Sequence, residues 1–298
     1  MSDSTASLSQ KIDSAGDLQS VVRTMKALAA SSIGQYEKSV RALADYYRTV
    51  ELGLSVCFRQ NESMLLSVRG GRKIDAGVIG AVVFGSDQGL VGQFNERIAD
   101  HAMHALAALP GKAHQVWAVG ERVHARLTDA GLPLAGLFPV PNSVQAIAPL
   151  VGQILLETEA GNRQDEITEL HLFYNCPTSG AGYEPVSQRL LPLDDTWRRK
   201  LAGLPWPTGN LPEVMGDNTA TLRALIREYL FISLFRACTE SLASENASRL
   251  AAMQRADKNI DELLEHLRGT FHRVRQSSID EELFDVISGF EALSGGAG

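Results

Sequence analysis

Two long stretches of the chain, one at each end, carry apolar residues at every third or fourth position. In the C-terminal stretch, from about Asp217 to Leu293, no proline or glycine occurs before Gly269, and Ala, Leu, Arg and Glu predominate. This composition predicts a helix that continues without interruption. A stripe with this spacing lies along one side of a helix and requires a partner helix to cover it. Its apolar positions are Leu250, Met253, Ala256, Ile260, Leu263, Leu267, Phe271 and Val274.

The length of this predicted helix exceeds what a compact domain can bury. A helix that continued to Phe290 would span roughly 110 Å at ~1.5 Å per residue. That is far more than the width of a domain of this size. The part of the helix that leaves the domain must therefore be buried against something outside it.

The N-terminal stretch, from about Ser9 to Ser63, shows the same alternation of three and four. Gly16, Gly34 and Gly53 weaken the predicted helix by ~1 kcal/mol each without ending it. Because a folded segment separates the two arms, we expect them to pair as a long antiparallel coiled coil. The apolar positions of the first arm are Leu18, Val22, Met25, Ala29, Tyr36, Val40, Leu43, Tyr47, Val50 and Leu54.

The middle of the chain holds all eleven prolines, between Pro110 and Pro212. Strand and helix patterns alternate there, which predicts a Rossmann-like α/β domain with a partly parallel sheet. The expected division is a coiled-coil helix at 1–65, the α/β domain at 66–212, whose last residues from 201 form a linker, and a second coiled-coil helix at 213–298. The predicted strands are 78–84, 115–119, 167–175 and 185–191, and the predicted helices are 95–108, 121–130 and 144–159.

Charge and composition narrow the possible functions. A net charge of −7 argues against bulk binding to nucleic acid or to anionic lipid. The polar N-terminus is not a signal peptide, and the longest apolar run, at 77–84, is too short to cross a bilayer. Cys57, Cys176 and Cys238 show no paired spacing, so we expect reduced thiols in a soluble, cytoplasmic protein.

One glycine-rich turn, at 85–93, has the position of a phosphate-binding loop, since it follows a strand and opens a helix. It matches neither common nucleotide motif and contains no lysine, so we interpret it as a tight turn. A nucleotide-dependent enzyme that uses this turn is the alternative. His101 and His104 lie one helical turn apart, but no third metal ligand is indicated. We therefore expect no catalytic residue, no cofactor site and no metal site.

The apolar stripe of the last helix breaks at 275–278 and resumes, shifted, at Ile279 and Leu283. One interpretation is a change of facing partner, as at a stutter in a coiled coil. The other is that the helix continues beyond the first arm and meets another protein there. The two interpretations are compatible.

Several segments resemble the γ subunit of F-type ATP synthases. The first arm contains TMKALAAS at 24–31, and the turn reads SDQGLVGQFN at 86–95. The last arm contains SENASRLAAM at 244–253, RQSSIDEEL at 275–283 and VISG at 286–289. The resemblance covers both arms and the start of the middle domain, and the inferred order of helix, α/β domain and helix is that of the family.

This resemblance implies a rotor without catalytic chemistry of its own. The tip of the coiled coil would enter the cavity of an α3β3 head and transmit torque, coupling ATP synthesis or hydrolysis to proton or sodium transport. The α/β domain would lie against the ε subunit and the membrane c-ring, at the cytoplasmic face of the bacterial plasma membrane. The alternative is a coiled-coil scaffold or tether that presents an α/β module.

The resemblance also implies which residues face the β subunits: Met25 and Lys26 on the first arm, and Arg275 and Gln276 on the last. The sequence departs from the family pattern at Gln88, Val91, Gln93 and Ser32. These departures are typical of a divergent lineage, such as the second F-type ATPase that some bacteria carry.

Overall fold

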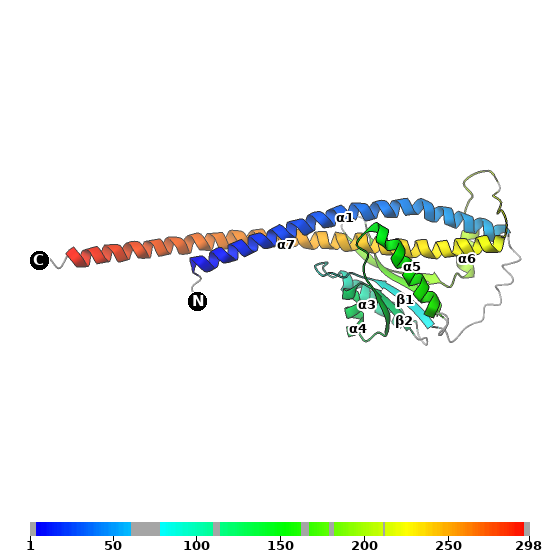
Figure 1. Cartoon of the computed structure of the whole chain (residues 1–298), viewed down its shortest axis with the longest axis horizontal. Helices are drawn as coiled ribbons and strands as arrows, with labels where there is room; N and C mark the ends of the chain where they lie inside the picture. Colours follow the sequence, from blue (N-terminus) through cyan, green and yellow to red (C-terminus); the bar gives the residue numbers. More distant parts are fainter. Residues whose placement is uncertain are drawn as a thin grey trace. The chain divides into compact units, whose positions relative to one another are not determined.

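The structure, a computed structural model, describes residues 4–60, 78–109, 114–161, 167–178, 182–210 and 212–294. Long helices begin and end this described chain, with alternating strands and helices between them (Figure 1). The elements in order are α1 Thr5–Gln60, β1 Val78–Phe84, α3 Phe94–Ala107, β2 His114–Val119, α4 Glu121–Asp129, β3 Leu134–Phe138, α5 Val144–Gly161, β4 Ile167–Pro177, β5 Tyr183–Leu191, α6 Asp195–Ala202 and α7 Asn218–Ser294.

The contacts divide the chain into two compact units. Unit 1 consists of residues 1–28 with 250–298, and unit 2 consists of residues 29–249. This division follows contacts between distant segments. The boundaries expected near residues 65 and 212 therefore stay a prediction about how the sequence is organised.

Unit 2 contains a five-stranded sheet with the order β3-β2-β1-β4-β5. The pairs β1–β2, β1–β4 and β2–β3 are parallel, and β5 runs antiparallel to β4. This is the strand order of a doubly wound fold, in which the direction of winding changes between β1 and β4. The predicted Rossmann-like α/β domain is confirmed.

Strand β1 is buried on both faces, as its continuous apolar sequence predicts. Ile79, Ala81 and Val83 face a core that they form with buried residues of α3 and α4. Val82 and Phe84 point to the opposite face, where buried residues of α5, α1 and α7 complete a second core. The sheet is thus the middle of three layers, and Figure 1 shows α3 and α4 beside β1 and β2.

Within unit 2, the C-terminal half of α1 and the N-terminal part of α7 belong to the core of the α/β domain. Leu54 of α1 and Ile232 of α7 are fully buried in the same cluster. The rings of Tyr47 and Tyr229 are 5.6 Å apart, and the ring of Trp197 from α6 lies 5.1 Å from Tyr229. The ring contacts join α1, α6 and α7, and the shared cluster, which includes residues of the sheet, packs the sheet against the two long helices.

Two short elements differ from the prediction. Strand β3 was not expected, because Pro133, Gly136 and Pro139 in and around it are typical of loops. Helix α6 was not expected either. It begins where the Asp194 carboxylate accepts a hydrogen bond from the Trp197 N–H at 2.8 Å, and Leu201 is buried within it. The linker expected from 201 therefore begins after Ala202.

In unit 1, α1 and α7 run antiparallel and share a small apolar core of Ala15, Val22, Met253, Ile260 and Leu264. The antiparallel pairing is as predicted, but two positions of the predicted stripes are wrong. Leu18 is 54% exposed and Leu263 is 49% exposed, whereas Leu264 is 5% exposed.

The physical reason for these errors is a strict alternation of four and three along the seam. On α1 the inward positions are 8, 12, 15, 19, 22 and 26, and on α7 they are 253, 257, 260 and 264. Some of these positions carry polar residues, which a search for apolar residues passes over.

Candidate functional site

The turn after β1 is held by hydrogen bonds from within the chain. The Asp87 carboxylate accepts one from the Glu121 N–H at 3.0 Å and one from the Val140 N–H at 2.9 Å. Because Glu121 is the first residue of α4, this carboxylate lies at the positive end of that helix. It neutralises there the N–H groups that would otherwise attract an anion.

Ser86 and Asn95 fix the other side of the turn. The Asn95 side-chain oxygen accepts a hydrogen bond from the Ser86 N–H at 2.9 Å, and its amide nitrogen donates to the Ser86 hydroxyl at 2.8 Å. A Cβ on Gly120, which has a φ of +112°, would lie 2.8 Å from the Ser86 backbone. The shape of the turn therefore depends on close backbone packing, which favours the tight-turn interpretation.

Helix α7 is hydrogen-bonded to the segments at the carboxyl ends of β1 and β4, the region where ligands bind in doubly wound folds. The Ser248 hydroxyl donates a hydrogen bond to the Val91 carbonyl at 2.5 Å, and the Ser244 hydroxyl donates to the Asn175 carbonyl at 2.9 Å. The Asn175 amide donates in turn to the Phe94 carbonyl at 3.1 Å. The polar groups of the SENAS segment thus attach α7 to the sheet.

A buried ion pair lies next to these serines on α7. An Arg249 guanidinium nitrogen is 2.6 Å from a Glu245 carboxylate oxygen, and both side chains are largely shielded from solvent. Burial raises the pKa of Glu245, and the nearby Arg249 partly opposes that shift. Such a pair is destabilising to break, because the remaining charge is left buried without a partner.

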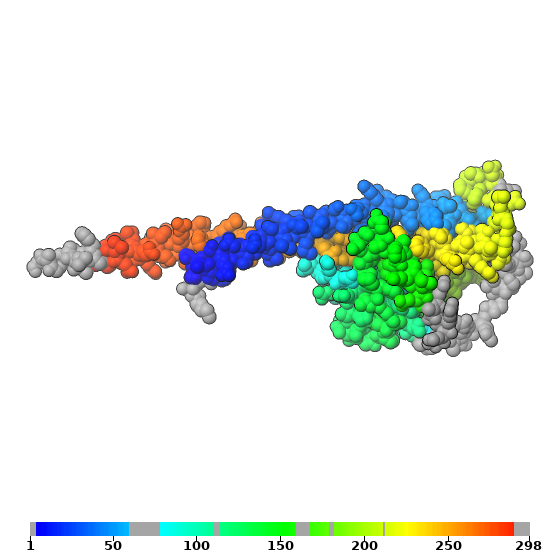
Figure 2. All heavy atoms as spheres, in the orientation of Figure 1, coloured from blue at the N-terminus to red at the C-terminus, as the bar shows by residue number. Residues whose placement is uncertain are grey.

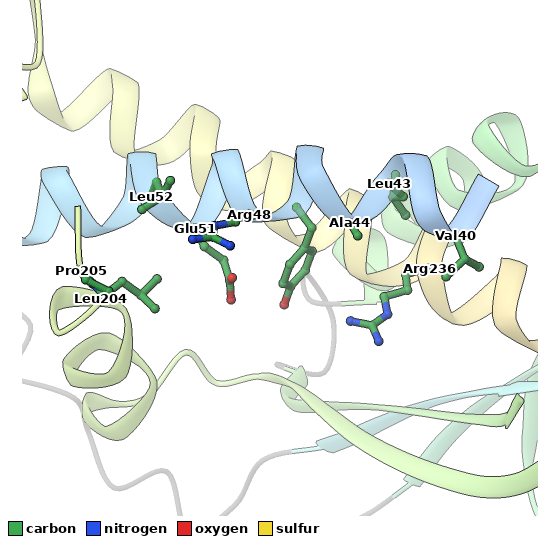
Figure 3. Close-up of a pocket in the computed structure, with 10 residues that line it drawn as sticks. Val40, Leu43, Ala44, Arg48, Glu51, Leu52, Leu204, Pro205 and Arg236 are labelled. Atoms are coloured by element: carbon green, nitrogen blue, oxygen red, sulfur yellow. The ribbon is translucent and has the colours of Figure 1, made fainter. Parts of the chain in front are cut away.

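A cavity of about 530 Å³ lies in unit 2 between α1 and the segment after α6. In Figure 3 the side chains of Glu51 and Arg236 point toward it. Burial raises the pKa of Glu51. The remaining lining residues are Val40, Leu43, Ala44, Tyr47, Arg48, Leu52, Leu204 and Pro205. The cavity has the size of a small-molecule site, but none of its lining residues is among the four predicted partner contacts.

Of those four, Met25 and Lys26 lie on α1 within unit 1. Met25 is half-buried and packs against the small apolar core. The Lys26 ammonium is 2.7 Å from the Asp257 Oδ2 atom of α7. Both residues therefore take part in the pairing of the two helices.

Asp257 is the centre of a polar cluster that the sequence did not reveal. Its Oδ1 atom accepts a hydrogen bond from the Arg23 Nε at 3.2 Å and one from the Gln19 Nε2 at 3.4 Å. Gln19 also donates to Asp261. The hydrogen bond from Lys26, together with those from Arg23, lowers the pKa of Asp257. The Gln19–Asp257 contact joins residues 238 positions apart, so only the register of the helices brings them together.

Arg275 and Gln276 lie on an uninterrupted part of α7, and both are exposed. The structure thus places Met25 against the small apolar core and Lys26 on Asp257, whereas Arg275 and Gln276 lie further along α7. The helix does not break at 275–278. The seam ends there, because α1 begins at Thr5, and the following residues to Ser288 are exposed.

Between residues 279 and 288, α7 carries large apolar side chains that no other part of the described structure covers. Phe284 is 68% exposed and Val286 is 69% exposed. Figure 2 shows this part of α7 extending past the N-terminal end of α1 in unit 1. Apolar residues grouped in this way mark an interaction surface. The others are Ile279, Leu283 and Ile287.

The histidine pair does not form part of a metal site in the described structure. The His101 ring packs 6.2 Å from the Phe173 ring, and His104 Nδ1 lies 2.6 Å from the Asp100 carbonyl. Among the residues whose positions are given, no three of His, Cys, Asp or Glu gather where they could share a metal ion. Within the same ranges, no helix combines the length and apolar character needed to cross a bilayer.

A family model described as ATP synthase matches residues 4–293. The ATP synthase gamma chain of Nostoc punctiforme is 27% identical, over 95% of this chain and 97% of its own length. The gamma chain of Leifsonia xyli is 28% identical, over 96% of both chains. These matches include both arms and the middle domain.

Solved structures show the same fold at lower sequence identity. A chain from the rotor of the Euglena gracilis mitochondrial ATP synthase aligns with a TM-score of 0.60 and 17% identity, covering 92% of this chain and 98% of that one. A chain from the central stalk and c-ring of the Tetrahymena thermophila enzyme gives a TM-score of 0.57 and 22% identity, covering 79% and 99%.

Proposed function

This chain belongs to the ATP synthase γ family, and on that premise we propose that it is the rotor of the central stalk of an F-type enzyme. In this role it transmits torque between an ion-driven membrane ring and the α3β3 catalytic head. The match of the family along residues 4–293 supports the proposal, since a rotor needs both arms and the domain between them.

The observation that carries the proposal is the uncovered end of α7. An apolar stripe of this length gains stability only when another surface covers it. A hollow formed by the α3β3 head provides such a cover without fixing the helix in one orientation. Contacts that differ among the β subunits then bias their conformations as the rotor turns.

The proposed subunit does no catalysis itself, and nucleotide chemistry takes place in its partners. The polar side chains of the turn at 85–93 support this view, because Asp87 and Asn95 are used to hold the chain's own backbone. The α/β domain is proposed to lie against the ε subunit and the c-ring, with the protein held peripherally at the cytoplasmic face of the membrane.

Of the four residues proposed to contact β, Arg275 and Gln276 are best placed for direct contact. Both are exposed, and an exposed guanidinium can form a bidentate pair with a carboxylate. Met25 packs against the apolar core that α1 shares with α7, and Lys26 forms an ion pair with Asp257 of α7. We therefore propose that both residues contact β only at the outer edge of the coiled coil.

The test is the double substitution of Arg275 and Gln276 by alanine in a complex reconstituted with α and β subunits. We expect coupled ATPase activity to fall about tenfold, the usual loss when charged hydrogen bonds are removed. Arg268→Ala, an exposed arginine on the same helix, is the matched control and should have no effect. Unchanged activity in the double variant would count against the proposed contacts.

A second measurement separates the rotor from the tether alternative. The mass of the purified assembly should correspond to one copy of this chain per α3β3 head. A free-standing dimer of this chain that does not join α and β would support the tether instead.

A further inference from the structure

The seam of unit 1 contains polar residues at positions where a coiled coil normally buries apolar ones. Gln19 and Lys26 occupy such positions on α1, and Asp257 occupies one on α7. Gln19 and Asp257 are each only 9% exposed. A polar residue in a seam lowers stability unless it meets a partner, and it is therefore used to specify register.

These residues do meet partners across the seam. Lys26 Nζ lies 2.7 Å from Asp257 Oδ2, and Gln19 Nε2 lies 3.4 Å from Asp257 Oδ1. Arg23, at the edge of the seam, reaches both acidic residues: its Nε is 3.2 Å from Asp257 Oδ1 and its Nη2 is 3.7 Å from Asp261 Oδ1. We call Gln19, Arg23, Lys26, Asp257 and Asp261 the seam clasp.

The seam clasp is balanced in charge, with the cations on α1 and the carboxylates on α7. All its ion pairs therefore join the two helices and none lies within one helix. A shift of one heptad would move the Lys26 ammonium roughly 10 Å along the axis from the Asp257 carboxylate, at ~1.5 Å per residue. The cluster is thus complete in only one register.

Apolar contacts alone do not hold a register so firmly. They are non-directional, and the seam residues around the clasp include the small side chain of Ala15. Hydrogen bonds and ion pairs have defined distances and angles, and so they resist the sliding of one helix along the other. A pair of helices that carries torque as one shaft must resist that sliding.

We infer that Asp257 is a positioning residue for coupling, because it locks the register of α1 against α7. This inference rests on the proposed function. It assigns to Asp257 a role in transmitting torque that is separate from assembly with the partner subunits.

The test compares Asp257→Lys with Glu262→Lys, which makes the same change of charge on the same helix. Within the described ranges, the ion pair of Glu262 is an exposed one with Lys258 on its own helix, at 3.8 Å. In the reconstituted, membrane-bound complex we expect Asp257→Lys to lower ion transport per ATP hydrolysed about threefold, as for the loss of coupled ion pairs. Glu262→Lys should leave this ratio unchanged.

A charge exchange provides the rescue. The double variant Arg23→Asp with Asp257→Lys restores a pair of opposite charges across the seam without altering a proposed β contact, and we expect it to recover about half of the lost coupling. A loss caused by poor folding alone would lower the yield of assembled complex and would not respond to the exchange.

The register itself is measured in the full-length chain, through the distance between nitroxide labels at Ser20 and Lys258 in a background without native cysteines. Asp257→Lys should broaden the distance distribution, and the charge exchange should narrow it again. An unchanged distribution, or a broadened one with normal coupling, overturns the inference. Failure of the wild-type chain to assemble with α and β would instead overturn the proposed function.

Discussion

The turn after β1 and the end of α7 are the two places where the sequence suggests an activity. They differ in whether their side chains find partners within the described chain. In the turn, Asp87, Asn95 and Ser86 form hydrogen bonds with the chain's own groups. At the end of α7, large apolar side chains such as Phe284 have no cover from the described chain.

This difference indicates where partners act. A polar loop whose groups are already paired contributes to stability, because replacing those bonds by bonds to a ligand brings little gain. An uncovered apolar stripe contributes little to stability and much to association. Substitutions in the two regions should therefore separate folding from assembly.

The largest expected effect is on the turn. Gly120→Ala would place a Cβ 2.8 Å from the Ser86 backbone at a φ of +112°. We expect the free energy of unfolding to fall by about 3 kcal/mol, from backbone strain together with overpacking. Gly131→Ala is the control, since its φ is +79° but its Cβ would have free space. That variant should lose about 1 kcal/mol, measured by urea unfolding. Equal losses would show that close packing of the turn is unimportant.

Asp87→Ala tests the hydrogen bonds of the same turn. It leaves the N–H groups of Glu121 and Val140 without their acceptor, and we expect a loss of about 2 kcal/mol in the free energy of unfolding. Gln88→Ala, next to it and exposed, should lose less than about 0.5 kcal/mol. If Asp87→Ala abolished nucleotide binding by the isolated chain while stability was unchanged, the enzyme alternative would regain support.

At the end of α7 we expect substitutions to weaken assembly and to leave the stability of the free chain nearly unchanged. Phe284→Ala with Val286→Ala should change the stability of the free chain by less than about 0.5 kcal/mol, since both side chains are exposed. The affinity for the α3β3 head should fall about tenfold, because the apolar area that the head would cover is lost. Titration of labelled chain with α3β3 measures that affinity. A loss of stability with normal assembly would reverse the comparison.

The smallest expected effect is the response of the helix register in unit 1 to a fall in pH. Lys26 and Arg23 lower the pKa of Asp257 in the folded chain, so the stabilisation by its carboxylate is complete above the ordinary aspartate value of 3.8. It is lost as the pH falls through the lowered value. The nitroxide distance between positions 20 and 258 should therefore stay narrow at neutral pH and broaden only in acid below the ordinary value. Asp257→Asn should lack this step, and a step at higher pH would contradict the prediction.

Much of the fold can be predicted from the sequence, because a strand buried on both faces is continuously apolar and a long helix lacks proline and glycine. Strand β1 is continuously apolar, and α7 contains no proline or glycine until Gly269, so both were expected where they occur. Strand β3 escapes such reasoning because it is short and lies between prolines. Its pairing with β2 is decided by the rest of the sheet.

The seam shows why the candidate site is harder to predict. Asp257 and Gln19 read as solvent-facing residues, and their burial depends on a partner on a distant helix. Without the register, Leu263 and Leu264 are equally good candidates for the core. By contrast, the resemblance to the family implies that Met25, Lys26, Arg275 and Gln276 contact the β subunits, and these contacts remain predictions.

The strict seven-residue repeat of the seam has a mechanical consequence. A straight helix drifts relative to such a repeat, so helices that keep it wind around each other with a left hand. Twisting such a pair of helices in one sense tightens the winding, and twisting it in the other sense opens the winding. The paired helices of unit 1 should therefore be stiffer against one direction of rotation, a difference that torque measurements on single molecules driven both ways would detect.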